Sequence, residues 1–421
     1  MVELGDNPKM HFRALAWAMG VAALVGSALV AQGPPPGQTP PAGGRGRGGP
    51  GGPQEQAPIA GGECPPGMTE FRAGRCGKPA APPPSIVDYR PKSTVVADPH
   101  LVPRAKFPVI DIHNHITVTP DNIEQLIKEM DSLNIRVLNN LSGSNGDRLK
   151  GSIETIRKSR YADRFTLFVN VDWDGAGGPG WKERAVAQVE EGVKNGAIGL
   201  KVFKNLGLTA RKADGSRLKV DDPDLDPVWQ ACARLNIPVL IHVADPAQFW
   251  SPVDFHNERW LELNVYPGRE YPQDRFPAFE QLMTERDRMF ARNPKTRYIN
   301  AHFGWHGNDF GRAARHLDTL PNVVFEVGAV LYEFGRQPRA ARDFFLKYQD
   351  RVLFGKDAYE PTEYPYYWRV FETRDEYFDY YRDYHAFWKL YGMDLPDAVL
   401  RKLYYQNAQR VTPGLPKTGF P

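Results

Sequence analysis

The stretch FPVIDIHNHI, residues 107–116, is a short apolar run that ends in two histidines, His113 and His115. Seven further runs of apolar and β-branched residues follow it along the chain. They are IRVLNNLS (135–142), FTLFVNVDW (165–173), AIGLKVFK (197–204), IPVLIHVAD (237–245), RYINAHFG (297–304), NVVFEVGAV (322–330) and RVLFGKDAY (351–359). Near-continuous apolar runs are typical of parallel strands that are covered on both faces.

The stretches between these runs show the spacing of amphipathic helices. The clearest cover residues 121–134, 182–196, 224–236, 279–293 and 309–320. Eight alternations of strand and helix over about 250 residues predict an α/β fold, a (β/α)8 TIM-type barrel. The alternative is an open doubly wound sheet, which lacks support because no G-x-G-x-x-G opens the first helix.

Composition divides the chain into five parts. Lys9 and Arg13 precede an apolar run at residues 14–31 that ends in small residues, a pattern typical of a secretory signal peptide. An uncleaved membrane anchor is the alternative, because the run is just long enough to span a bilayer. The parts are a signal peptide (1–31), a Gly/Pro-rich disordered linker (32–62), an N-terminal extension (63–106), the barrel (107–412) and a C-terminal tail (413–421).

The three cysteines fit this division. Cys64 and Cys76 lie close together in a region expected to be exported, so we expect a disulfide between them. Cys232 lies in a helix-like stretch, and we interpret it as a small buried apolar residue. The chain would then act in the periplasm or outside the cell.

The charge pattern is not that of a nucleic-acid-binding protein. The 421 residues carry a formal net charge of +3 with both signs interspersed, and no basic stripe is present. We expect a small-molecule substrate, and a membrane contact only if the apolar run stays uncleaved. For assembly, the alternatives are a monomer and a homodimer.

Polar residues at the ends of the apolar runs indicate a metal site. Residues two apart in a strand point the same way, so His113 and His115 should both face the barrel axis. His242, His302 and Asp357 lie near the ends of the fifth, sixth and eighth runs. Barrel enzymes place their chemistry on that face. Three imidazoles and one carboxylate suit a divalent metal, with zinc expected, and leave a position open for water.

Six segments, taken in order, resemble the amidohydrolase superfamily, in particular its amidohydrolase-related branch. They are DIHNH (111–115), IGLKVF (198–203), LIHVAD (240–245), NAHFG (300–304), LFGKD (353–357) and LYYQNAQR (403–410). The branch includes hydrolases and metal-dependent non-oxidative decarboxylases such as aminocarboxymuconate semialdehyde decarboxylase. The resemblance implies that His113, His115, His242 and Asp357 are metal ligands. It also implies that His302 polarises the substrate or transfers a proton.

Two lysines and an inner aspartate need separate interpretations. Lys201 has inward parity in the fourth run. In some relatives a lysine here is carboxylated and bridges two metals, whereas in others one metal suffices. We therefore expect one ion, with two as the alternative, and Lys201 either as a ligand or as a substrate contact. Lys204 lies where that run enters its loop and is a candidate for substrate binding. Asp111 lies one layer deeper, and we interpret it as structural.

Two aromatic-rich inserts exceed a minimal barrel: residues 246–274 after the fifth run, and residues 360 to about 394 after the eighth. Loops of this length are uncommon unless they are functional. We expect the first to overhang the barrel mouth, or to contact a second subunit. Further candidates for substrate binding follow the strands. Together with Lys204, the candidates are Trp250, Arg259, Trp305, Tyr332 and Arg336.

The function expected from these residues is that of a metal-dependent hydrolase. A metal-activated water would attack a C–N or C–O bond, Asp357 would move its proton, and His302 would stabilise the developing oxyanion. The alternative is a metal-dependent decarboxylase of an aromatic or enolic acid, a carbon–carbon lyase. A catalytically inactive binding protein is a third reading, which the filled ligand positions disfavour.

Export predicts a processed N-terminus. Protein from the native host should begin near Leu29 or Gln32, because cleavage follows the small residues at the end of the apolar run. N-terminal sequencing measures this directly. Soluble cytoplasmic protein with an intact Met1 would contradict the prediction.

Overall fold

The computed structural model describes residues 55–59, 62–80, 89–97, 99–254 and 256–421. The chain forms two compact units, Met1–Pro83 and Pro84–Pro421, and the boundary falls within the predicted extension. The predicted signal peptide and most of the predicted linker lie outside the described residues. Within the described part of the chain, no helix has the length and apolar character needed to cross a membrane.

The first unit contains a small antiparallel sheet. Its strands are β1 (Glu55–Gln56), β2 (Thr69–Arg72) and β3 (Arg75–Gly77), in the order β1-β3-β2. Cys64 and Cys76 form a disulfide that joins the loop before β2 to β3. The expected disulfide is therefore present, and Cys232 is a buried free thiol, as expected.

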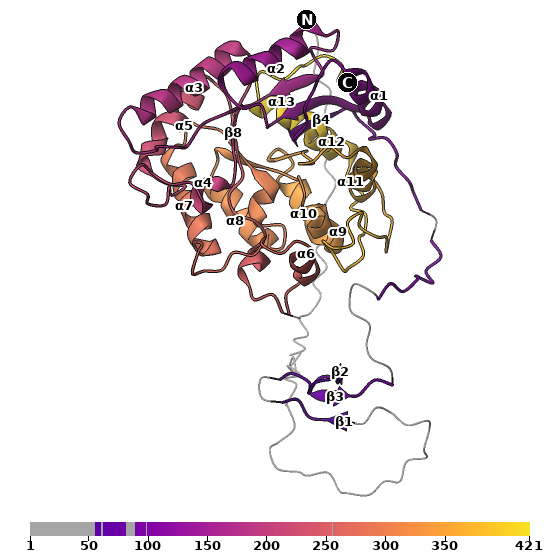
Figure 1. Ribbon diagram of the computed structural model, residues 1–421. Helices are drawn as coiled ribbons and strands as arrows, with labels where there is room; N and C mark the ends of the chain where they lie inside the picture. Colours follow the sequence, from indigo (N-terminus) through magenta and orange to yellow (C-terminus); the bar gives the residue numbers. More distant parts are fainter. Residues whose placement is uncertain (1–54, 60–61, 81–88, 98, 255) are drawn as a thin grey trace, which may run out of the picture. The chain divides into compact units, whose positions relative to one another are not determined.

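The second unit is a parallel barrel whose strands form one three-stranded and one six-stranded sheet, with helices around them (Figure 1). Its strands, from β4 to β12, follow the eight predicted runs in order, and the third run is split into β6 and β7. They are β4 (Val109–Asn114), β5 (Ile135–Asn140), β6 (Phe165–Leu167), β7 (Val169–Asn170), β8 (Leu200–Val202), β9 (Val239–Ile241), β10 (Tyr298–Asn300), β11 (Val323–Glu326) and β12 (Val352–Leu353). Neighbouring strands pair in parallel register from β4 to β6 and from β7 to β12.

The barrel closes between its first and last strands. The main-chain N–H of Ile112 donates to Phe354 O over 3.1 Å, and that of Asp357 donates to His113 O over 2.7 Å. Asn114 and Asp357 form a further parallel bridge. The predicted (β/α)8 barrel is confirmed, and the open sheet is wrong.

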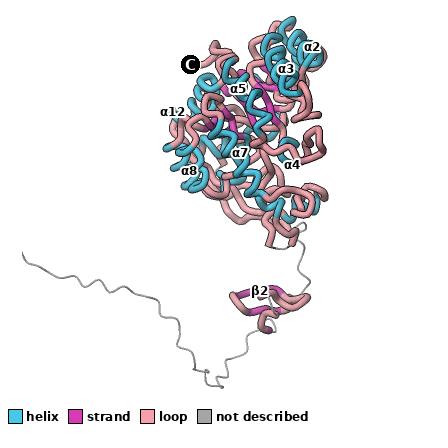
Figure 2. Tube along the Cα trace, turned by 90° about the vertical axis from the view of Figure 1, so that its left-hand side faces the viewer, coloured by secondary structure: helices cyan, strands magenta, loops and turns pink. Residues whose placement is uncertain are grey.

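Helices form the outer layer around the strands (Figure 2). Their apolar stripes face the sheet: Leu126, Ile127 and Met130 of α1 are all buried. The helices that follow the strands are α1 (Ile123–Leu133), α2 (Gly146–Lys158), α3 (Trp181–Asn195), α4 (Asn205–Leu208), α5 (Asp226–Arg234), α7 (Phe279–Arg292), α8 (Phe310–Thr319), α9 (Leu331–Arg336) and α10 (Pro338–Lys347). The five predicted helices correspond to α1, α3, α5, α7 and α8.

The remaining elements lie in the two inserts, in short turns and at the C-terminus. They are η1 (Pro223–Leu225), η2 (Ala247–Trp250), α6 (Trp260–Val265), η3 (Ala301–Trp305), η4 (Pro361–Glu363), α11 (Tyr364–Glu372), α12 (Asp397–Arg401), the π-helix η5 (Lys402–Gln406) and α13 (Asn407–Val411). The two inserts contact each other. Arg259 donates to His385 O over 3.0 Å, and His385 Nε2 lies 3.3 Å from Glu262 Oε1.

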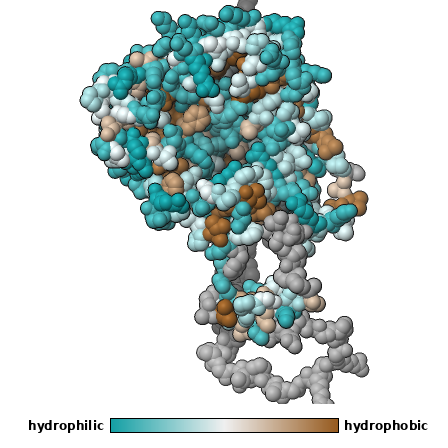
Figure 3. All heavy atoms as spheres, in the orientation of Figure 1, coloured by the Kyte–Doolittle hydropathy of each residue, from teal (hydrophilic) through white to brown (hydrophobic). Residues whose placement is uncertain are grey.

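The surface contrasts with this apolar interior. The face drawn in Figure 3 is mainly hydrophilic, with small separate hydrophobic patches. The exposed large apolar side chains include Val96, Leu101 and Phe387. Most apolar side chains of the strands and inward helix faces are instead buried in one continuous core.

Asp111 links the first and last strands of the barrel from inside. Its buried carboxylate accepts from the main-chain N–H groups of His113 (3.2 Å) and Lys356 (3.0 Å). It also accepts from Asn114 Nδ2 (2.8 Å) and Tyr364 OH (2.7 Å). Burial raises the pKa of Asp111 to about 6 despite these donors. The structural interpretation of this residue agrees with these contacts.

Replacing Asp111 should therefore weaken the closed barrel. Asp111→Ala leaves buried donors on both end strands without an acceptor, and we expect the free energy of unfolding to fall by about 3 kcal/mol. Urea denaturation measures the loss. Asp111→Asn keeps one acceptor oxygen and should lose less. Equal stability of the alanine variant and the wild type would refute this role.

Candidate metal centre

His113, His115 and Asp357 meet at the carboxyl end of the barrel strands. His113 Nε2 lies 3.2 Å and His115 Nε2 lies 3.5 Å from Asp357 Oδ1. Burial favours the neutral carboxyl. The hydrogen bond to His113 and the nearby imidazoles outweigh that effect and hold the pKa of Asp357 well below its ordinary value. An ionised carboxylate and two imidazole nitrogens at this spacing can hold a metal ion.

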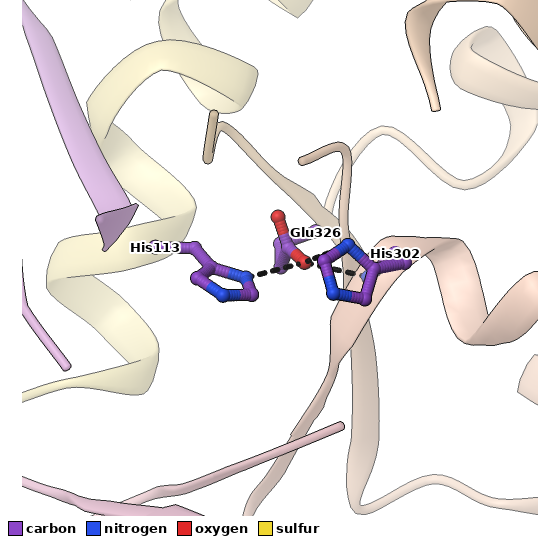
Figure 4. Close-up of side chains that lie close together, drawn as sticks. All are labelled: His113, His302 and Glu326. Atoms are coloured by element: carbon purple, nitrogen blue, oxygen red, sulfur yellow. Dashed lines mark hydrogen bonds and ion pairs between the residues drawn. The ribbon is translucent and has the colours of Figure 1, made fainter. Parts of the chain in front are cut away.

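Glu326 at the end of β11 orients His113 (Figure 4). The ring N–H at Nδ1 of His113 donates to Glu326 Oε1 over 2.9 Å. When the ring is neutral, as metal binding requires, its lone pair is therefore at Nε2, the nitrogen that faces Asp357 and Lys201. A carboxylate behind a metal-binding imidazole raises its basicity and fixes its tautomer.

Glu326 also holds the backbone that carries His302. Its Oε1 accepts from the main-chain N–H of His302 over 2.6 Å, and its Oε2 accepts from that of Gly328 over 2.6 Å. His113, His302 and Glu326 lie close enough together to share a metal ion. Because three N–H donors already occupy the Glu326 oxygens, we interpret this residue as the support of the ligands.

His242 and His302 present facing nitrogens. The ring of His302 donates from Nδ1 to Gly328 O over 2.8 Å, and the ring of His242 donates from Nε2 to Ala244 O over 2.9 Å. A carbonyl oxygen can only accept, so the other nitrogen of each neutral ring carries a lone pair. Burial lowers the pKa of both rings, that of His302 to about 3.

These two lone-pair nitrogens, His302 Nε2 and His242 Nδ1, lie 3.2 Å apart. Two lone pairs at that distance repel each other unless a cation or a proton lies between or beside them. The donor set of the site therefore fits a divalent metal ion. Donor atoms of His113, His115 and Asp357 lie within ligand distance of one another, and His242 and His302 lie beside them.

An unusual backbone turn presents His302. Residues His302, Phe303, Gly304 and Trp305 have successive φ angles of 55°, 57°, 60° and 58°. A left-handed conformation costs a residue other than glycine roughly 1–2 kcal/mol. Gly304 is required here, because a Cβ would lie 2.5 Å from Asn300 Nδ2. The surrounding contacts must therefore offset several kcal/mol to hold this turn.

Lys201 on β8 faces the same centre. Its Nζ lies 3.2 Å from His113 Nε2, and its side chain is buried. Burial lowers the pKa of Lys201 to about 8. In the described part of the chain, no carboxylate forms an ion pair with it; Asp357 and Glu326 act on it only at longer range. The centre thus contains a buried amine without an anionic partner in contact.

Two of the expected substrate-binding residues lie beside the centre. Trp305 stacks on His302 with a ring separation of 4.7 Å, and its ring lies 5.8 Å from that of His242. Lys204 Nζ lies 2.6 Å from Asp245 Oδ2, next to His242. Both therefore lie next to His242.

The other four candidates are engaged within the inserts and α9. Trp250 stacks on Tyr271 at 4.3 Å and donates to Pro277 O. The Arg259 guanidinium lies 4.6 Å from the Tyr332 ring and also pairs with Glu262.

Arg336 pairs with Glu258 at 3.0 Å and with Glu333 at 2.7 Å. Its guanidinium also covers the Trp388 ring at 4.3 Å. These contacts join the insert after β9 to α9 and to the insert after β12.

Glu326 was not among the residues expected from the sequence. It lies in the apolar run NVVFEVGAV, where a single acid is a visible exception. Val324 and Glu326 share one strand face, and the inward parity of Glu326 could have marked it. Its partner His113 is 213 residues away in the sequence, so no local pattern connects them.

Residues 110–413 match the protein family described as Amidohydrolase. A search of curated proteins finds no match. Among solved structures, an uncharacterised TIM-barrel protein of Bordetella bronchiseptica is 15% identical with a TM-score of 0.48, and the match covers 73% of this chain and 99% of that chain.

Two decarboxylases are also similar. A 2,6-dihydroxybenzoate decarboxylase from Rhizobium is 16% identical with a TM-score of 0.45, covering 73% of this chain and 99% of that chain. A dihydroxybenzoic acid decarboxylase from Polaromonas sp. JS666 was solved with manganese and the inhibitor 2-nitroresorcinol. It is 14% identical with a TM-score of 0.46, covering 73% and 97%.

Removing Glu326 should weaken metal binding. Glu326→Ala frees the His113 ring and the His302 backbone, and we expect the affinity for Zn²⁺ or Mn²⁺ to fall about 10–100-fold. Equilibrium dialysis measures the affinity. Glu285→Ala is the control, because Glu285 is also buried but pairs with Arg217 away from the centre. Equal affinities of the two variants would show that Glu326 does not support the ligands.

Proposed function

The chain belongs to the amidohydrolase family, and from that membership we propose a metal-dependent enzyme that removes CO2 from a small aromatic or enolic carboxylic acid. The observation that carries this proposal is Lys201. Its buried amine faces His113, and among the residues that the structure describes no carboxylate forms an ion pair with it. A carboxylate on the substrate would supply the missing anion.

The metal ligands proposed are His113, His115, His242 and Asp357. These residues would hold a divalent ion, which would supply a Lewis acid for substrate oxygen atoms and for negative charge on the substrate. One ion accounts for these ligands. Zinc suits three nitrogens and one oxygen, and manganese suits an oxygen-rich substrate bound beside them.

The residues around the ligands would perform the remaining work. Lys201 binds and orients the substrate carboxylate. As that group leaves as CO2, the electron pair of the broken C–C bond stays on the substrate carbon, which takes up a proton. His302 is the proposed group that carries this proton. Its Nδ1–H is committed to Gly328 O, so only Nε2 is available for exchange.

Trp305 would complete the substrate site. Its ring stacks on His302 and is only partly buried. An aromatic wall beside a metal centre suits a planar substrate, because two flat apolar surfaces exclude water when they stack. Lys204, on the loop that follows β8, is proposed to contact a further polar group of the substrate.

Hydrolysis is the second candidate, and one observation favours it. Asp357 is held in its ionised form, so it can accept a proton from a water molecule that attacks a carbonyl carbon. A two-metal hydrolase would further need Lys201 to be carboxylated. The 3.2 Å separation of its Nζ from His113 Nε2 leaves little room for that group unless the lysine withdraws.

Site of action and partners complete the proposal. We propose that the mature chain acts outside the cytoplasm on a small molecule. The support is the apolar run at residues 14–31 and the disulfide of Cys64 and Cys76. The insert surfaces around α6 are the place where a second copy of the chain would be sought.

The two reactions give different products. Metal-loaded protein should release CO2 from a hydroxylated aromatic or enolic acid, and in D2O the product should carry deuterium on the former carboxylate-bearing carbon. Lys201→Met should lower kcat/KM by about 10²-fold or more, because a charged hydrogen bond to the carboxylate is lost. His113→Ala should lose both the metal and the activity.

The control is Lys212→Met, since Lys212 forms ion pairs with Asp222 and Asp224 outside the centre. The panel should also include amides and lactones in ¹⁸O-labelled water. Metal-dependent hydrolysis with label in the acid product, and no CO2 from any acid, would replace decarboxylation by the second candidate. Protein that binds no stoichiometric metal would refute both.

A further inference from the structure

Arg286 of α7 lies against the left-handed turn that residues His302–Trp305 form after β10. We infer that Arg286 is a positioning residue: its guanidinium holds this turn and thereby sets where His302 Nε2 and the Trp305 ring face the metal centre. With respect to turnover the inference rests on the proposed function. With respect to the geometry of the turn it stands on the contacts of Arg286 alone.

The guanidinium bridges the turn at two points. Its Nη1 donates to Gly304 O over 2.9 Å, and its Nη2 donates to His306 Nε2 over 3.1 Å. These two acceptors lie on either side of Trp305 in the sequence. A third donor, Nε, reaches Asp287 Oδ1 over 2.9 Å. Each of the three guanidinium nitrogens thus has an acceptor, and the two terminal ones point at the turn.

Ion pairing alone does not explain why the Arg286 side chain is buried. The side chain is fully buried, which is costly for a charged group. Its one carboxylate partner in the described chain, Asp287, has a side chain that is 39% exposed. A planar, rigid fork that spans two acceptors is what a guanidinium provides and a lysine ammonium does not. The geometry of the turn is therefore the requirement that Arg286 meets.

The acceptor at His306 is suited to this contact. Burial, together with the positive charge of Arg286, lowers the pKa of His306 well below its ordinary value, so the ring is neutral and Nε2 can accept. The main-chain N–H of His306 also donates to Phe303 O over 3.1 Å, inside the same turn. Arg286 thus grips both a carbonyl of the turn and the residue that ends it.

The conformation of this turn sets the orientation of the His302 and Trp305 rings. Trp305 stacks on His302 at 4.7 Å, and the His302 ring lies 4.2 Å from that of His242. Three residues other than glycine occupy a conformation that they disfavour. Without Arg286, the carbonyl of Gly304 and Nε2 of His306 would be buried without a donor. The turn would then relax, and the Trp305 ring would leave its stacked position.

The test uses the full chain with fluorinated tryptophan. Nine tryptophans give separate ¹⁹F signals, and Trp305→Phe identifies the one from Trp305. In Arg286→Met the Trp305 signal should move away from its wild-type position. For a substrate that the wild type turns over, kcat should fall by about 10²-fold while KM changes little, because reacting groups are misplaced and substrate contacts remain.

Arg217→Met is the matched control. Arg217 pairs with Glu285 on the same helix α7, and its side chain is 17% exposed. That variant loses a comparable ion pair without touching the turn, so it should keep the Trp305 signal and kcat of the wild type. If Arg286→Met gives the same signal and the same kcat as Arg217→Met, Arg286 only stabilises the fold and the inference is overturned.

A second variant guards against misfolding. Arg286→Lys keeps the charge but reaches only one of the two acceptors, so it should fold with a shifted Trp305 signal and a reduced kcat. A wild-type signal in Arg286→Lys also overturns the inference. Failure of the proposed function is distinguishable: the wild type would then turn over no substrate, while the ¹⁹F signal still responds to Arg286.

Discussion

The buried carboxylate of Glu326 joins the parts of the metal centre. It accepts one N–H from the ring of His113, one from the backbone of His302 and one from the backbone of Gly328. Burial opposes its ionisation, but the charge and the hydrogen bond of His113 hold the pKa of Glu326 down, at about 2. Ligand orientation on β4 and backbone geometry after β10 therefore depend on one ionised group.

The centre combines strong local charges with little compensation from the protein. The ionised Asp357 faces two imidazoles, and Lys201 approaches one of them without an acid of its own. In a medium of low polarity such an arrangement is costly unless a further ion joins it. The protein therefore keeps charged groups at this place that are not fully paired with each other. The buried ion pairs elsewhere in the barrel, such as Arg217 with Glu285, differ because each charge has its partner.

The barrel could be predicted because its signals are periodic and local. Each apolar run is long enough to be recognised, and the two-residue period of a strand places His113 and His115 on one side. The end of a parallel strand is also a definable position, so His242, His302 and Asp357 could be assigned to one face without knowing any distance. The structure brings these five residues together.

The residues that could not be predicted act across the fold. In the sequence, Arg286 looks like an ordinary helix residue. Its burial depends on the turn at residues 302–305 that packs against the helix. The left-handed turn was also invisible, because only Gly304 among its four residues favours that conformation. Propensity is a weak prior that tertiary contacts override, and here the contacts with Glu326 and Arg286 do so. Hydrolysis with two metal ions would need Lys201 as a carboxylated bridge, and the 3.2 Å contact of its Nζ with His113 Nε2 favours a free amine.

The turn at residues 302–305 should also leave a mark on how this sequence diverges. L-residues with branched Cβ atoms are the least tolerant of a left-handed backbone, whereas asparagine and glycine enter it easily. The ring of Phe303 packs on Phe325 and Phe334, which offsets part of the cost of this conformation. Among distantly related sequences that keep this turn, we expect valine, isoleucine and threonine to be rare at these positions. Backbone handedness, independent of the reaction, would then restrict which amino acids can flank the histidine.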